Sequence, residues 1–333
     1  MRNRKVKIDK KDRRIIYELE NNCRRSLNKI AKKVGLSKQA LHYRIERLVR
    51  EGAIIQFIAN IDYSKLGYVN HEVWLQFNEI TKEQKEEFIN FLKNHPNIRW
   101  LASCGGKFDL AMAIMAKDVI FFSEILNQIL GRYNGYVQNH FITISKGVWT
   151  YPRSYLINDK ENRNQGHLLF GGALKTQHLD EKELKILHLL SKNAKLSTVE
   201  IAQKVGLTPI TIRTKIRQFE KEGIIVGYKA IIQPAAIGIE NYEVLITTQN
   251  VSEDKMKGFQ TYCQLNPYIT FLLKIVGRWD LNISFDAENG EHFQQMMIEI
   301  RSRFGSIIRD YEYVPILWVY KFDFAPVNEC KGN

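Results

Sequence analysis

The feature that most constrains the fold of this chain is an internal repeat. When the 333 residues are aligned with themselves at an offset of 171, sixteen of the 49 positions in residues 9–57 are identical, and no gap is needed. The same offset places Gly106 on Gly277 and Asp109 on Asp280. A register kept over so long a stretch indicates a tandem duplication, so we expect two copies of one architecture.

Each copy opens with a pattern typical of three short helices. In the first copy, apolar residues recur at helical spacing over residues 10–20, 27–34 and 38–50. Gly35 and Ser37 separate the last two segments, as a glycine helix stop and a serine N-cap do. Two short helices joined by such a tight turn are typical of a helix-turn-helix, whose last helix enters the major groove of DNA.

Alternating strands and helices follow in each copy. Their predicted order is βαββαβ, which is that of a ferredoxin-like domain. In the first copy we expect strands at 71–77, 100–104, 110–115 and 137–149, with helices at 82–93 and 119–132. In the second copy we expect strands at 242–248, 269–276, 281–285 and 309–322, with helices at 253–263 and 291–304.

The expected fold class is therefore α+β, with two tandem copies of a winged or helix-turn-helix DNA-binding domain followed by a ferredoxin-like domain. We place these domains at 1–60 and 61–150 in the first copy and at 179–231 and 232–326 in the second. Residues 151–178 are rich in Asn, Gly and mixed charge and are predicted to be a linker. Its apolar segment 168–170 is suited to dock on a neighbouring surface.

Composition and spacing argue against several classes of protein. The longest uncharged apolar stretches are far shorter than the roughly 20 residues that span a bilayer, so we expect no contact with a membrane. Residues 1–7 lack the apolar core of a secretory signal, which favours a cytoplasmic protein. The four cysteines form no Cys-x-x-Cys pair and the eight histidines are scattered, so we expect no disulfide framework and no metal. Without a phosphate loop, zincin pair or serine elbow, we expect no cofactor and no enzymatic activity.

The positive charge of the chain is local. There are 49 Lys and Arg against 36 Asp and Glu, a net charge of +13. Residues 1–57 hold 17 basic and 6 acidic side chains, which is +11, whereas residues 180–228 hold 9 and 6, which is +3. Clustered positive charge attracts a polyanion such as double-stranded DNA. We expect the first three-helix unit to supply most of the DNA affinity, and the second to bind more weakly or not at all.

The candidate DNA contacts are the polar side chains that the apolar stripe of each last helix leaves exposed, since these can donate to base edges or phosphates. They are Lys38, Gln39, His42, Tyr43, Arg44 and Arg47 in the first copy and Thr211, Arg213, Thr214, Lys215 and Arg217 in the second. Five flanking residues extend the basic surface: Arg24, Arg25, Lys29, Lys32 and Lys33. Residues 1–7 are either a basic arm that follows a groove or a frayed tail.

In several motifs each half resembles a complete member of the Lrp/AsnC family, the feast/famine transcriptional regulators. The motifs are Ile8 to Asp12 and Leu179 to Glu183, Ile30 to Ser37, Arg44 to Gly52, Gly106-Lys107-Phe108-Asp109-Leu110 and Gly277-Arg278-Trp279-Asp280-Leu281. The resemblance implies a DNA-binding domain, a ferredoxin-like domain called the regulation of amino acid metabolism domain, and in many members a small effector, often an amino acid, bound between subunits.

The same resemblance places the effector at the glycine–aromatic–aspartate turns. The implied effector residues are Gly105, Gly106, Lys107, Asp109, Gly277, Arg278 and Asp280. Glycines allow close approach to backbone N–H groups that suit a carboxylate, and an aspartate suits an ammonium group. The alternative is a tight hairpin turn in which each aspartate bonds only to nearby backbone.

The fusion of two copies departs from the family, whose ordinary members have a single copy and form symmetric homodimers. We expect one chain to equal one dimer and to bind a DNA site with unequal half-sites, since the halves differ in sequence. Further assembly into a higher homo-oligomer is also expected from the resemblance.

Two other functions stay open. A siroheme decarboxylase resembles the same family and can also occur as a two-half fusion. Its family typically shows a His-Asn-Tyr motif, but the nearest candidate here, Asn70-His71-Glu72, has no Tyr, and His140 stands outside any such motif. The other alternative is an effector-sensing protein that does not bind DNA.

Overall fold

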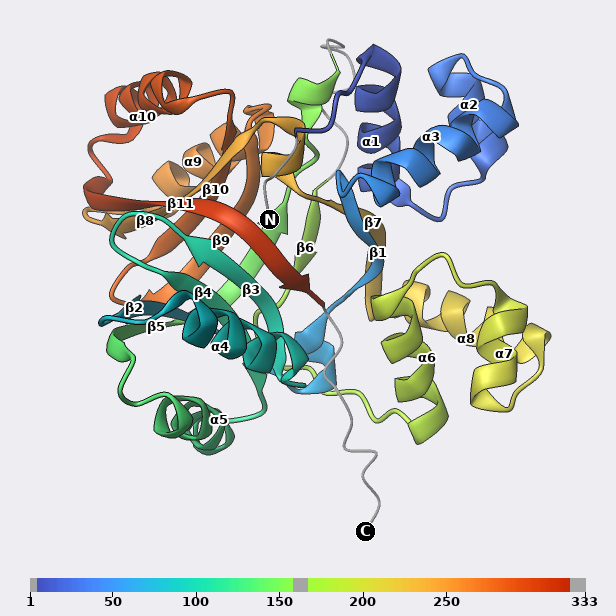
Figure 1. Cartoon of the computed structure of the whole chain (residues 1–333), viewed down its shortest axis with the longest axis horizontal. Coiled ribbons are helices and arrows are strands. Elements are labelled where there is room, and N and C mark those ends of the chain that lie inside the picture. The colour runs from blue at the N-terminus through green and yellow to red at the C-terminus, as the bar shows by residue number, and fades with distance from the viewer. Residues whose placement is uncertain (1–4, 158–166, 324–333) are drawn as a thin grey trace.

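The computed structural model describes residues 5–157 and 167–323. Eight of its strands form a closed barrel of two four-stranded sheets (Figure 1). The first sheet has the order β3–β4–β2–β5 and the second the order β9–β10–β8–β11, and pairing of β3 with β11 and of β5 with β9 closes the ring. The strands are β2 (Val69–Phe77), β3 (Ile98–Cys104), β4 (Leu110–Ala116), β5 (Val137–Thr150), β8 (Glu240–Thr248), β9 (Ile269–Gly277), β10 (Leu281–Ala287) and β11 (Ile308–Phe322).

Helices cover the outer face of each sheet. Helices α4 (Lys82–Asn94) and α5 (Val119–Arg132) bury Phe88 and Phe122 against the first sheet. Helices α9 (Glu253–Leu265) and α10 (Gly290–Phe304) bury Phe259 and Phe293 against the second sheet. Each sheet with its two helices is a ferredoxin-like domain, as the sequence predicted.

A three-helix unit precedes each ferredoxin-like domain. The helices are α1 (Lys10–Asn22), α2 (Leu27–Val34) and α3 (Lys38–Arg50) in the first unit and α6 (Glu181–Lys192), α7 (Thr198–Val205) and α8 (Pro209–Lys221) in the second. Gly35 ends α2 with a left-handed backbone, φ 67°, and the Ser37 side chain then caps α3. The predicted helix-turn-helix geometry is confirmed in both copies.

Two strands that the sequence analysis did not predict interlock the halves. Strand β1 (Ile54–Ile61) pairs antiparallel with β7 (Ile225–Ile232) and places Ala59 opposite Tyr228. Helix α1 packs on β7 and α6 packs on β1, so each three-helix unit rests on the strand of the other half. Figure 1 shows both units on the same side of the barrel, joined to it by this two-stranded ribbon.

Residues 151–157 and Phe170 of segment 151–178 are packed against the rest of the chain, whereas residues 172–176 are exposed. The short strand β6 (Leu168–Phe170) pairs with the end of β5, and Phe170 is fully buried against Tyr63. One turn of 3-10 helix, η2 (Ser154–Leu156), precedes it, and further turns η1 (Tyr63–Leu66) and η4 (Pro234–Ile237) follow β1 and β7. The connection is therefore part of the structure between the halves.

The predicted helices and strands of both copies are confirmed to within two residues at their ends. The predicted α+β class, with two helix-turn-helix units and two ferredoxin-like domains, is also confirmed. Among the described residues, no helix is long and apolar enough to cross a bilayer.

Candidate nucleic-acid interface

Helix α3 presents a polar face away from the core of its unit. Leu41, Ile45 and Leu48 are buried in the core, and the turn between α2 and α3 fixes the direction in which the opposite face points. Four of the six predicted contacts lie on that face and are exposed: Lys38, Gln39, His42 and Tyr43. Tyr43 has an exposed fraction of 63%. These side chains are therefore accessible to a ligand as large as a DNA duplex.

The other two predicted contacts in α3 are held by carboxylates of the same unit. Arg44 Nη1 lies 2.7 Å from Asp9 Oδ2 and 2.8 Å from Asp12 Oδ1, and Arg47 Nη2 lies 2.6 Å from Asp12 Oδ2. These hydrogen bonds, first to Asp9 and then to Asp12, raise the pKa of Arg44. Because Asp12 is buried and also completes the capping box of α1, both arginines fix α3 against α1.

The second unit repeats this division between exposed and paired side chains. Arg213, Thr214 and Arg217 are exposed on α8, whereas Thr211 is half-buried. Lys215 Nζ lies 2.5 Å from Glu183 Oε1, so Lys215 forms an ion pair within its own unit, as the equivalent Arg44 does in the first unit. Ile210 is 76% exposed at the start of the helix, where the first unit has Gln39.

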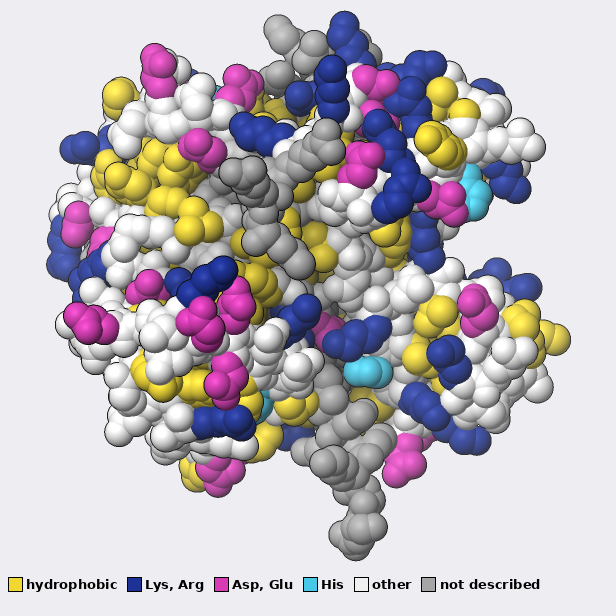
Figure 2. Space-filling view, viewed as in Figure 1, with side chains coloured by type: hydrophobic (Ala, Val, Ile, Leu, Met, Phe, Trp, Pro, Cys, Tyr) yellow, Lys and Arg dark blue, Asp and Glu magenta, His cyan; other side chains and the backbone are white. Residues whose placement is uncertain are grey.

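The flanking basic residues are also divided between structural and free roles. Arg25 and Lys33 both pair with the buried Glu18. Arg24 donates to the carbonyl oxygen of Ala194 at 2.6 Å and so ties the first unit to the second. Lys29 and Lys32 are exposed and form no ion pair with the described residues. Figure 2 shows Lys and Arg side chains gathered over the unit of α1, α2 and α3.

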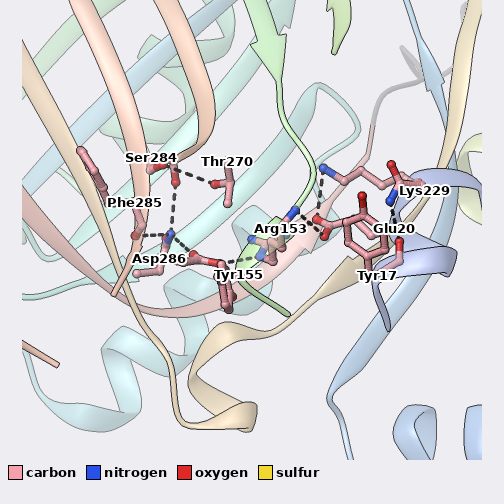
Figure 3. A network of polar contacts seen from close by, with 11 residues as sticks. Tyr17, Glu20, Arg153, Tyr155, Lys229, Thr270, Ser284, Phe285 and Asp286 are labelled. Carbon is pink, nitrogen blue, oxygen red and sulfur yellow. Dashed lines mark hydrogen bonds and ion pairs between the residues drawn. The ribbon is translucent and has the colours of Figure 1, made fainter. Parts of the chain in front are cut away.

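A buried ionic network behind α1 was not foreseen from the sequence (Figure 3). Arg153, in the segment after β5, pairs with Glu20 of α1 and lies 2.5 Å from Asp286 of β10. Lys229 of β7 lies 3.3 Å from the same Glu20 carboxylate, and Tyr155 donates to Asp286 at 2.7 Å. Although burial opposes it, the charges of Arg153 and Lys229 lower the pKa of Glu20. No local pattern signals these residues, since their partners lie over a hundred positions away in sequence.

The two glycine–aromatic–aspartate turns meet at one end of the barrel. Lys107 Nζ lies 2.5 Å from Glu312 Oε2, and Arg278 Nη2 lies 3.0 Å from Glu312 Oε1. Phe108 and Trp279, from the two turns, meet edge to face with ring centroids 6.3 Å apart. The turns that the duplication made equivalent are therefore neighbours in space.

The aspartates of both turns bond to backbone. Asp109 Oδ2 accepts from Phe77 N at 2.8 Å, and Asp280 Oδ2 accepts from Thr248 N at 2.7 Å. Gly277 has φ 144°, and a Cβ atom added there would lie 2.7 Å from the carbonyl oxygen of Ile142. The predicted residues Gly105 and Gly106 lie in the other turn, beside Lys107. Each aspartate thus links its turn to a neighbouring strand.

Comparisons with known proteins agree with this geometry. Residues 8–49 match the AsnC-type helix-turn-helix domain, and residues 179–226 match a winged helix-turn-helix DNA-binding domain. The chain is 27% identical over 146 residues to an uncharacterised helix-turn-helix transcriptional regulator of Pyrococcus horikoshii, which covers 42% of this chain and 97% of that protein. The chain resembles the Lrp/AsnC family of transcriptional regulators. It is also 27% identical over 122 residues to the leucine-responsive regulatory protein of Rhizobium meliloti, over 36% of this chain and 78% of that one.

A solved structure shares the doubled architecture. The siroheme decarboxylase NirDL is 14% identical in sequence and has a TM-score of 0.60, and the match covers 96% of this chain and 95% of NirDL. This likeness shows that the two chains share one overall fold. The fold alone does not assign the activity.

Proposed function

We propose that this chain is a sequence-specific DNA-binding regulator of transcription. The observation that carries the proposal is the exposed polar face of α3, which the Asp9 and Asp12 ion pairs hold in place and which the exposed Lys29 and Lys32 flank. Lys38, Gln39, His42 and Tyr43 are the residues we assign to DNA. Arg44 and Arg47 orient this face and contact DNA only through the parts of their side chains left exposed, 27% and 25%.

One chain supplies the two DNA-binding units that a family homodimer would supply. Helix α1 of the first half packs on β7 of the second, and α6 of the second half packs on β1 of the first. This reciprocal packing supports the assignment, because neither unit rests only on its own half. The two faces differ, since α3 begins with Lys38 and Gln39 where α8 has Pro209 and Ile210. A proline and an isoleucine make no bidentate contact with a base, so the two half-sites should differ in sequence and in strength.

A pair of matched lysine variants tests the DNA contact. Lys38 and Lys82 are both exposed first residues of a 13-residue helix that follows a hydroxyl N-cap, but Lys82 lies on α4, on the ferredoxin-like domain. We expect Lys38→Ala to weaken binding of a target fragment in a gel shift by roughly fivefold to a hundredfold, and to reduce the slope of log affinity against log salt by about one if it contacts a phosphate. Lys82→Ala should bind as the parent does. Equal affinity of all three proteins would remove Lys38 from the interface.

We further propose that a small effector with a carboxylate group, such as an amino acid, binds at the paired turns. Lys107 and Arg278 converge there on one carboxylate, that of Glu312, and an effector carboxylate that replaced it would keep both cations paired. The Asp109 and Asp280 carboxylates are engaged by backbone, so in this proposal they hold the turns rather than the ligand. Gel shifts titrated with the common amino acids test the proposal. We expect at least one amino acid to change the DNA affinity of the parent and to have a weaker effect on an Arg278→Gln variant. A parent whose affinity does not change, or a variant that responds as the parent does, would refute it.

The enzymatic alternative has only the shared fold in its favour. His71 lies on the outer face of β2, stacked on Phe122 of α5 with ring centroids 4.1 Å apart, and His140 is exposed on β5. Neither histidine lines the cavity inside the barrel, which has a volume of about 90 Å³, far below the several hundred Å³ of sites that enclose large organic ligands. Release of carbon dioxide from siroheme by the purified chain would establish the alternative.

A further inference from the structure

A cavity of about 90 Å³, bounded by both sheets and by β7, lies inside the barrel. We call it the inter-sheet cavity. Its wall combines aromatic side chains, such as Trp100 and Phe271, with buried polar ones. Glu72 and Glu243 enter it from β2 and β8, and they are 171 residues apart, so they occupy equivalent positions in the two copies. Two carboxylates from opposite sheets thus share one small interior space.

The two copies differ in the strand next to each glutamate. Glu72 lies opposite Ala113 of β4, whereas Glu243 lies opposite Ser284 of β10. At the inward positions, β4 carries Ala111, Ala113 and Met115, while β10 carries Asn282, Ser284 and Asp286, all buried. Burying a polar group costs free energy unless it finds a partner. The wall of the cavity is thus polar on the side of β10 and apolar on the side of β4.

Two acceptor atoms in this wall have no donor. Within residues 5–157 and 167–323, no hydrogen-bond partner reaches Glu243 Oε2 or Asn282 Oδ1. Both side chains are more than nine-tenths buried, with exposed fractions of 8% and 2%. Asn282 Nδ2 points to the other glutamate, 3.5 Å from Glu72 Oε2. Asn282 thus lies beside Glu72 with its own oxygen still unsatisfied.

The cationic side chains that line the cavity, Arg99, Arg153 and Lys229, already have polar or charged partners. Arg99 Nε donates to Asn70 Oδ1 at 2.6 Å. Arg153 and Lys229 are turned toward Glu20 in the ionic network, as Figure 3 shows. Among the described residues, these cations leave Glu243 Oε2 and Asn282 Oδ1 without a donor, and a group that donates several hydrogen bonds and carries positive charge would match these two atoms.

The electrostatics of the two glutamates agree with this. Burial, and then repulsion by Glu72, raise the pKa of Glu243 to about 8, and burial also raises the pKa of Glu72. A cation placed between the two carboxylates would offset the repulsion by Glu72 that raises the pKa of Glu243.

We propose that the inter-sheet cavity binds a small primary amine, whose ammonium group donates to Glu243, Asn282 and Glu72. A primary ammonium group has three N–H donors, one for each of these side chains. The cavity is small, at about 90 Å³, so the ligand has only a few heavy atoms. This site is separate from the α3 face and from the paired turns, and its occupancy does not depend on DNA binding.

Calorimetric titration and thermal unfolding with methylammonium chloride test the proposal on the full chain. Tetramethylammonium chloride, which has the same charge but no N–H donor, is the matched control ligand, and phosphate buffer replaces Tris because Tris is itself a primary amine. We expect methylammonium to bind and to raise the melting temperature in proportion to its concentration, with no such effect of tetramethylammonium.

Three variants locate the site. Glu243→Gln removes a buried charge and so is expected to fold, and it should lower methylammonium affinity by at least about tenfold, as loss of a charge-assisted hydrogen bond does. Asn282→Ala should lower the affinity as well. Glu253→Gln, on the exposed face of α9, should bind as the parent does. A flat response of the parent, an equal response to tetramethylammonium, or unchanged affinity in Glu243→Gln would each overturn the proposal.

Discussion

At the scale of single residues, Glu243 sets a dependence of stability on pH. Its pKa is about 8 in the folded chain against an ordinary 4.5, so between these values the folded state binds more protons than the unfolded state. Stability that this carboxyl group contributes below pH 4.5 is therefore lost as the pH rises through 8, by about 1.4 kcal/mol per pKa unit. In amine-free buffer we expect Glu243→Gln to be more stable than the parent at pH 8.5, with the difference shrinking toward pH 5 in urea titrations. A difference that grows toward low pH would contradict this.

Single residues also show where sequence reasoning reached its limit. Lys38 and Tyr43 were predicted from helical spacing, and the structure exposes both. The same spacing cannot reveal that Arg44 is bound by Asp9, because the pairing depends on how α3 crosses α1. Glu243 could not have been singled out, since an alternating strand pattern does not show whether an inward polar residue faces a core or a cavity.

At the scale of elements, Arg153 joins α1 to β10, and its loss should be costly. It lies 8% exposed between Glu20 of α1 and Asp286 of β10, both fully buried as side chains. Arg153→Met leaves both carboxylates without their main cation, and we expect a loss of about 3–5 kcal/mol in the free energy of unfolding. Lys257→Met, which removes a cation from an exposed pair on α9, should leave the urea midpoint unchanged. A cost below about 1 kcal/mol for Arg153→Met would show that the network adds little to stability.

Most elements follow from local pattern, and those that were missed depend on the other half of the chain. Period and capping residues were enough for the helices and barrel strands. Among the described residues, strands β1 and β7 pair only with each other, and β6 adds a short edge to β5. Their apolar residues show no alternation that separates a strand from a connection. These strands form because the two halves of the chain pack against each other, which the local sequence does not show.

At the scale of the whole molecule, the central claim is that one chain carries two unequal DNA-binding units on one side of a closed barrel. DNase I footprinting of the full chain on genomic fragments tests it most directly. We expect two protected half-sites of different sequence. In the Lys38→Ala variant, protection of one half-site should be lost at a lower salt concentration than in the parent, while protection of the other half-site should be unchanged. Two equivalent inverted half-sites, or no protection of duplex DNA even in dilute buffer, would contradict the claim.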